Sequence, residues 1–231
     1  LGKFLLRQGR RRPARMTAWT QRYRAWLGTQ HFAEPAQEAT CVDYLHEVDH
    51  AADRIRRLET AIDTAVAATP VAMRAVIAAL QTLRGIKQLT AATIVCEVGT
   101  LTRFAHPRQL MGYSGTVPRE HSSGSRVRRG AITKTGNAHL RRVLVEAAWA
   151  YRHGPSCTGN LKQRQAGQPA AITALAWKAQ HRLCARYRRL VARGKSKQHV
   201  VTVIARELVG FLWAIGVETE RGREAAHRAA A

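Results

Sequence analysis

Acidic residues are scarce in this chain of 231 residues, and two long stretches have none. Fifteen Asp and Glu stand against 38 Lys and Arg, which gives a formal net charge of +23 at pH 7. Residues 3–24 carry eight basic groups and residues 161–199 carry ten, with no acid in either stretch. Solvated surface does not require such sorting, so the imbalance favours a polyanionic partner, above all nucleic acid.

Long hydrophobic runs are also missing. The longest uncharged apolar stretches, 64–73 and 208–217, have ten residues each, whereas a membrane span needs roughly 18. No membrane partner is therefore expected, and the basic first fifteen residues do not resemble a signal peptide. The four cysteines include no CxxC pair, which excludes a zinc knuckle, and a disulfide framework is not expected at this size. Reduced thiols and a cytoplasmic location follow.

Apolar residues make up 45 % of the chain, and their spacing predicts a mostly α-helical protein. The apolar positions of residues 45–66 recur every three or four residues, which predicts a coiled-coil-like helix over 41–70. That helix could pair with a second chain or pack on its own domain. Helices over 71–83 and 89–98 flank a Gly-Ile turn and resemble a helix-hairpin-helix, whose turn amides bind phosphate; an ordinary helical hairpin is the alternative.

Residues 114–136 form a long, polar, glycine-rich and basic segment. A loop of this length within a compact domain is usually functional, and only a short strand pairing near 114–118 and 126–132 fits its pattern. Ser123 stands directly before Gly124, among basic side chains that could hold phosphates: Arg126, Arg128, Arg129 and Lys134. A serine hydroxyl is a poor nucleophile alone, so these residue types favour a phosphate-contacting loop over catalysis.

Three helices are predicted after this loop. Asn137 caps the first, whose N-terminal amides would favour a phosphate. Arg141 on the same helix is a further candidate phosphate-binding residue, which supports the site or faces solvent. The second, roughly 170–192, carries a basic stripe that predicts a surface following nucleic-acid backbone, with a solvated arginine face as the alternative. The residues of that stripe are Lys178, Arg182, Arg186, Arg189 and Arg193. The third runs over about 198–216, and residues 218–231 are expected to fray.

Several motifs together resemble a known family. They include Leu83-Arg-Gly-Ile, Gly112-Tyr-Ser-Gly-Thr, Ser122-Ser-Gly, Ile132-Thr-Lys-Thr-Gly-Asn and the Leu140-Arg-Arg helix start. The pattern resembles the C-terminal, serine-bearing domain of the IS110/IS116/IS902 insertion-sequence transposases, the bridge-RNA-guided serine recombinases. The resemblance covers nearly the whole chain. It implies a transposase that cuts and rejoins DNA through a serine–phosphate intermediate, with Ser123 as nucleophile, in a bacterial cytoplasm at the nucleoid.

The same resemblance implies a domain plan and a set of partners. Family members carry an N-terminal RuvC-like domain in which four acidic residues hold Mg²⁺, and no acid precedes residue 34 here. Residues 1–40 are thus expected to be a basic arm that follows such a domain, and 71–217 the transposase domain. Mg²⁺ is expected only with the RuvC-like domain, without which the chain would be inactive. The implied partners are double-stranded DNA, a noncoding guide RNA, and further copies in a dimer or tetramer.

The alternative to a working transposase is a truncated, non-catalytic remnant that binds nucleic acid. Such a protein would keep the basic surfaces and lose the chemistry. An RNA-binding, chaperone-like protein is a weaker possibility, because few aromatic residues stand among the basic clusters and stacking on single strands needs them.

Overall fold

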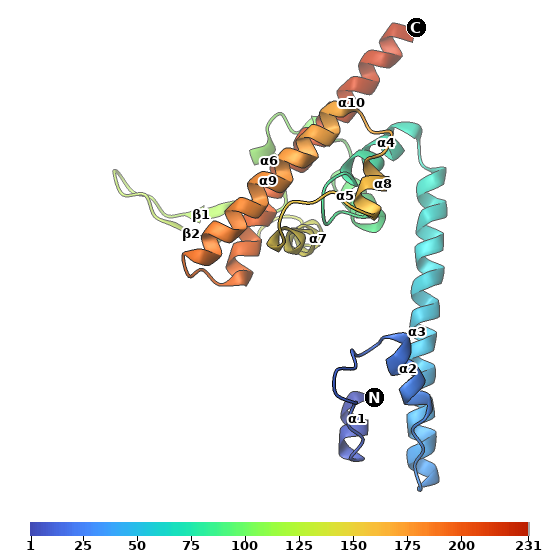
Figure 1. Cartoon of the computed structure of the whole chain (residues 1–231). Coiled ribbons are helices and arrows are strands. Elements are labelled where there is room, and N and C mark those ends of the chain that lie inside the picture. Colours follow the sequence, from blue (N-terminus) through green and yellow to red (C-terminus); the bar gives the residue numbers. More distant parts are fainter. Residues whose placement is uncertain (231) are drawn as a thin grey trace. The chain divides into compact units, whose positions relative to one another are not determined.

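The computed structural model describes residues 1–230, except for the side chains at positions 129, 229 and 230 (Figure 1). The described chain is mostly α-helical, as predicted, and its one sheet has two strands. The helices are α1 (Gly2–Arg7), α2 (Gln21–Gly28), α3 (Pro35–Ala68), α4 (Val71–Leu80), α5 (Gln88–Val98), α6 (Pro107–Tyr113), α7 (Ala138–Ala148), α8 (Asn160–Gln165), α9 (Ala170–Ala192) and α10 (Lys197–Ala230). Short 3₁₀ helices lie at Leu101–Arg103 (η1) and Trp149–Arg152 (η2).

The chain divides into two compact units, of which the first is Leu1–Ala61. Helices α1 and α2 in this unit share a small apolar cluster that includes the buried Leu5, Tyr23 and Leu27. Thr20 caps α2 by accepting a hydrogen bond from the amide of Tyr23 (3.2 Å). The expected basic arm is therefore folded around aromatic and aliphatic side chains, and its arginines remain on the surface.

Helix α3 contains 34 residues, a length of about 51 Å at 1.5 Å per residue. It begins at Pro35, six residues before the expected coiled-coil-like helix, because proline suits the first turn of a helix. The apolar face predicted from the 45–66 spacing is uncovered in its middle, since the side chain of Ile55 is 57 % exposed and that of Leu58 is 53 % exposed. Near its two ends the face is covered, because Leu45 packs against the apolar cluster of the first unit and Val66 against the core of the second, whereas Ile55 and Leu58 belong to neither.

The second unit begins at Ile62 and contains the main core. Helix α10 packs against α4, α6, α7, α9 and η1, and its apolar positions Ile204, Leu208 and Leu212 are buried. Over the described residues, α10 is the one helix long and apolar enough to cross a membrane, but more than half of that segment is buried inside the protein. It is therefore positioned as a core helix.

The C-terminal part of α10 differs from the expectation. The helix does not end near residue 216 but continues to Ala230. Glu220 helps to hold it, because its carboxylate accepts hydrogen bonds from the amides of Leu101 (2.8 Å) and Thr102 (2.7 Å) at the start of η1. Those partners lie more than 100 residues away in the sequence, so the spacing of the tail alone could not reveal them.

Helices α4 and α5 form the predicted hairpin around Gly85. The turn is packed against the protein, with Leu83 and Ile86 fully buried. Gly85 has φ +85°, and a Cβ atom there would lie 2.3 Å from the carbonyl oxygen of Ala147 on α7. Glycine is required because only it combines this backbone conformation with so close an approach.

Candidate active site and nucleic-acid interface

The serine-rich segment folds into a β-hairpin that projects beyond the helices of its unit (Figure 1). Strands β1 (Pro118–Glu120) and β2 (Arg129–Ile132) are antiparallel, close to the short pairing that the sequence allowed. Beyond them Ser123 and Arg126 exchange two backbone hydrogen bonds of 3.1 Å each. Gly124 and Ser125 therefore make a two-residue turn, and the positive φ of Gly124 (+55°) supports it. Ser123 lies at the tip of the hairpin.

The serines of the hairpin differ in what their hydroxyls contact. Ser122 Oγ donates to Glu120 Oε1 (2.8 Å) and accepts from the amide of Arg128 (3.3 Å). Ser123 Oγ has no hydrogen-bond partner among the described residues, and its side chain is exposed. No described atom lies within 4 Å of a Cβ built on Gly124. The hydroxyl of Ser123 is thus open to a reaction partner, whereas that of Ser122 already holds the hairpin.

The hairpin base, which we define as residues 113–117 and 133–137, fixes the hairpin to the second unit. The amides of Thr133, Lys134 and Asn137 donate to the carbonyl oxygens of Val117 (2.9 Å), Gly115 (3.1 Å) and Tyr113 (2.8 Å). Two glycines let these segments touch. A Cβ on Gly115 would lie 1.9 Å from the oxygen of Thr135, and one on Gly136 would lie 2.3 Å from that of Tyr113. The tip is open, but its support is closely packed.

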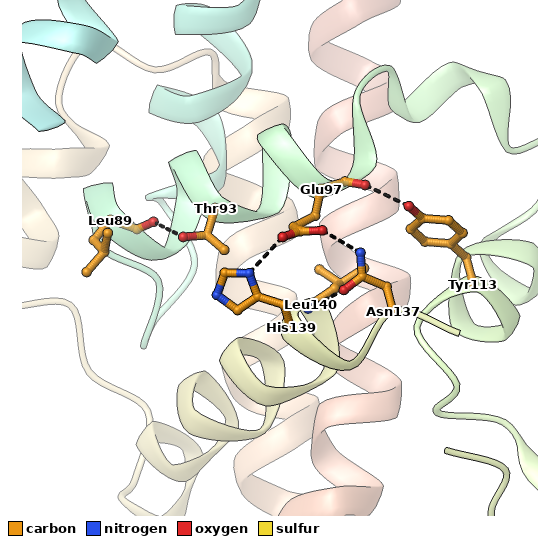
Figure 2. Close-up of polar contacts among 7 residues, drawn as sticks. All are labelled: Leu89, Thr93, Glu97, Tyr113, Asn137, His139 and Leu140. Carbon is orange, nitrogen blue, oxygen red and sulfur yellow. Dashed lines mark hydrogen bonds and ion pairs between the residues drawn. The ribbon is translucent and has the colours of Figure 1, made fainter. Parts of the chain in front are cut away.

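Glu97 connects the hairpin base to α5 (Figure 2). Its carboxylate accepts hydrogen bonds from Asn137 Nδ2 (2.5 Å) and His139 Nδ1 (2.7 Å), and its backbone oxygen accepts one from Tyr113 Oη (2.8 Å). The hydrogen bonds from Asn137 and then His139 hold the pKa of Glu97 below its usual value. Sequence reasoning assigned Glu97 no role, although it stands in the stretch between the α4–α5 turn and the serine-rich segment.

Asn137 is the N-cap of α7, as predicted. Its Oδ1 accepts the amide of Leu140 (2.8 Å), while its Nδ2 binds Glu97. Its side chain therefore holds the helix start, and its role as a phosphate ligand stays a prediction. Arg141 donates through Nη1 to the carbonyl oxygen of Ser114 (3.0 Å) and is half-buried. Of the two roles left open for Arg141, the structure supports that of holding the site together.

The predicted phosphate ligands of the loop are placed on or near the hairpin. Arg126 and Arg128 are exposed close to Ser123, and Lys134 is exposed at the hairpin base with φ +59°. The side chain of Arg129 lies outside the described part of the structure. At least two guanidinium groups thus accompany Ser123 at the hairpin, a composition suited to the non-bridging oxygens of a phosphate.

The basic stripe of α9 needs a correction. The sequence predicts a stripe without acids, but Glu207 of α10 pairs with Arg186 and also accepts from Arg182 Nε (2.9 Å). The acid stands outside residues 161–199 and reaches the stripe because α9 and α10 pack together. For Lys178, Arg189 and Arg193 the described residues supply no ion pair, and all three are exposed. These three are the stripe cations most available to a phosphate backbone.

The acidic and metal-ligating side chains are dispersed. Among the described residues, no three His, Cys, Asp or Glu side chains lie close enough together to hold a metal ion. The part of the chain that the structure describes therefore does not fit the Mg²⁺ site that the family resemblance implies for a RuvC-like domain.

Comparison with known proteins bears on this site directly. A family model described as the IS116/IS110/IS902 transposase family matches residues 77–163, which include the hairpin and α7. A Sinorhizobium fredii protein named putative transposase y4qE is 41 % identical over 220 residues, covering 94 % of this chain and 52 % of the relative. The transposase for insertion sequence element IS1533 of Leptospira borgpetersenii is 29 % identical over 196 residues, covering 84 % of this chain and 56 % of the relative.

The chain spans about half the length of these relatives. A third relative, the transposase for insertion sequence element IS1111A of Coxiella burnetii, is 39 % identical over 71 residues, which cover 31 % of this chain and 20 % of the relative. The family match falls on the unit that bears Ser123, and the similarity to y4qE extends along nearly the whole chain. Residues 77–163 therefore resemble the transposases of the IS116/IS110/IS902 family, and the chain is similar to proteins named transposases along nearly its whole length.

Proposed function

We propose that this protein acts in the transposition of an insertion sequence, as a recombinase that cuts and rejoins DNA through Ser123. The observation that carries the proposal is the placement of Ser123. Its unengaged hydroxyl lies at the open tip of a hairpin whose base is held by backbone hydrogen bonds, with Arg126 and Arg128 exposed beside it. A nucleophile on a fixed support, beside groups that bind phosphate, suits phosphoryl transfer.

The proposed reaction is a transesterification. Ser123 Oγ forms a bond to the scissile phosphorus, and the bond from that phosphorus to a deoxyribose oxygen breaks. In the net reaction the hydroxyl proton of the serine ends on the released deoxyribose oxygen. The product phosphodiester keeps the number of ester bonds unchanged, so a deoxyribose hydroxyl can reverse the step and rejoin the strands. Arginine side chains would offset the charge that builds on the phosphoryl oxygens.

The proposal includes partners beyond a single DNA duplex. A noncoding guide RNA would select the DNA, and the exposed cations Lys178 and Arg189 supply further backbone contacts. The uncovered apolar face of α3, with Ile55 and Leu58 exposed, supports association with a second copy. Mg²⁺ would be held by carboxylates of a RuvC-like domain, and the protein would work in a bacterial cytoplasm at the nucleoid.

A second candidate function is nucleic-acid binding without strand cleavage. The net charge of +23 favours it, because basic surfaces bind DNA whether or not Ser123 reacts. The two functions share the binding step and differ only in whether a covalent bond to the protein forms. An experiment that measures both quantities on the same samples separates them.

That experiment uses nicked duplex donors carrying the ends of the element, together with the guide RNA and a family RuvC-like domain joined to the chain. We expect a protein–DNA adduct on a denaturing gel for the wild-type protein, and none for Ser123→Ala. Ser125→Ala is the matched control and should retain the adduct. Ser122→Ala should retain it as well, although it also removes the hydrogen bonds to Glu120 and Arg128. Duplex affinity should be the same for all four proteins, because each change removes a hydroxyl and no charge.

The possible outcomes are distinct. An adduct that survives Ser123→Ala would remove Ser123 from the role of nucleophile. DNA binding without any adduct under these conditions would favour the second candidate. Failure to bind DNA at all would contradict both functions.

A further inference from the structure

The outward face of α9 holds an aromatic ring that the nucleic-acid surfaces described above do not include. Trp177 is 45 % exposed, although tryptophan is usually well buried. Its ring meets that of His181, one turn along the helix, edge to face at 4.5 Å between centroids. This contact leaves nearly half of the surface of Trp177 to solvent. Trp177 is thus an aromatic side chain without a full set of neighbours.

The surroundings of Trp177 are strongly basic. Lys178, the next residue along α9, is exposed, and Arg182, Arg188 and Arg189 are exposed further along the helix. Residues 161–199 contain no acid, and the acid of α10 that reaches this helix is taken up by Arg182 and Arg186. An anionic partner that presents a flat apolar surface to the ring would match this part of α9.

Unpaired DNA offers both features. Its phosphates repeat along the strand, and each base has a π-face that stacks on an aromatic side chain. In a duplex those faces are covered by neighbouring base pairs, and only base edges are exposed in the grooves. We propose that Trp177 stacks against a base of an unpaired DNA strand, whose phosphates are bound by cations of α9 such as Lys178. The inference rests on the proposed function, since strand exchange on DNA exposes unpaired strands.

The test compares affinities for a single-stranded oligodeoxynucleotide, the matched duplex and a single-stranded RNA of the same sequence. Trp177→Leu keeps an apolar side chain without a π-face, and Trp177→Tyr keeps an aromatic ring. We expect Trp177→Leu to weaken single-stranded DNA binding by about 5- to 150-fold, the effect of removing one base–aromatic stack. Trp177→Tyr should weaken it much less, and duplex affinity should change by less than about two-fold for both variants.

Circular dichroism melting confirms that the variants fold, and Trp177→Tyr provides a second comparison if Trp177→Leu is destabilised. The inference is overturned if both variants bind single-stranded DNA like the wild type, if duplex affinity falls as much as single-strand affinity, or if only RNA binding falls. Equal decreases for single-stranded DNA and RNA support it, because stacking does not read the sugar. Normal duplex binding with no effect of Trp177 would refute this inference alone, whereas no DNA binding by the wild type would also contradict the proposed function.

Discussion

Replacing Gly136 with alanine should destabilise the hairpin base far more than the same change at the tip. Gly136 has φ +88°, and a Cβ there would lie 2.3 Å from the carbonyl oxygen of Tyr113 and 3.3 Å from that of Gly112. Left-handed backbone costs an alanine about 1–2 kcal/mol. Forcing a methyl group into a filled site costs typically about 1–3 kcal/mol more. The backbone atoms cannot turn aside as a flexible side chain would, so we expect the free energy of unfolding to fall by about 2–5 kcal/mol in total.

Gly124→Ala is the matched control. Gly124 also has positive φ, +55°, but no described atom lies within 4 Å of the added Cβ, so the expected cost is only the backbone part, about 1–2 kcal/mol. Scanning calorimetry measures the difference, and each kcal/mol lowers the Tm of a unit of this size by about 2–4 °C. Equal Tm values for the two variants would show that the close approach of Gly136 to Tyr113 does not hold the hairpin base.

Three further predictions test the Glu97 network, the α3 face and the α9 stripe. Folding lowers the pKa of Glu97, so the stability that its carboxylate contributes is present above the usual carboxyl pKa and is lost as pH falls through the lowered value. The difference in Tm between wild type and Glu97→Gln should therefore shrink from about pH 6 to about pH 3. A constant difference would contradict the stabilising role of the Glu97 hydrogen bonds. Ile55→Asp should weaken self-association at least about 100-fold without lowering Tm, because a carboxylate buried in an apolar interface costs several kcal/mol. Light scattering measures the molar mass, which should not change for the exposed control Arg57→Asp. Replacing Lys178 and Arg189 with alanine should flatten the dependence of log affinity on log salt by about 0.9 for each phosphate that the variant no longer neutralises, and an unchanged slope would show that neither side chain binds phosphate.

The sequence predicts α4, α5, α7, α9 and the first part of α10 because their apolar periodicity reflects burial in the core of the second unit. It does not predict the short helices α1, α2, α6 and α8. Asn137 is an N-cap where a cap was expected, and Gly85 lies at the turn between α4 and α5. The segment around Ser123 also has its predicted short pairing, although the turn residues Gly124 and Ser125 make it a hairpin rather than a long loop. A sequence pattern is sufficient to predict a cap or a turn when the contacts that form it lie within a few residues of each other.

What the sequence does not reveal depends on interactions between distant residues. Glu97 binds Asn137 and His139 across about 40 positions, and Glu207 neutralises arginines that precede it by about 20. Glu220 holds the C-terminal part of α10 by accepting hydrogen bonds from the amides of Leu101 and Thr102, more than 100 residues earlier. No periodicity in one segment encodes a partner in another, so these side chains resemble ordinary surface acids until the helices are packed together.

The identity of the residue that becomes joined to DNA tests the central claim most directly. Trypsin cleaves after Arg119 and Arg126, which releases the peptide 120–126 with all three serines of the hairpin tip. Tandem mass spectrometry of the nuclease-trimmed adduct locates the attached nucleotide within that peptide. We predict a deoxynucleotide phosphate on Ser123. A phosphate on Ser122 or Ser125, or on any residue outside this peptide, would contradict the account.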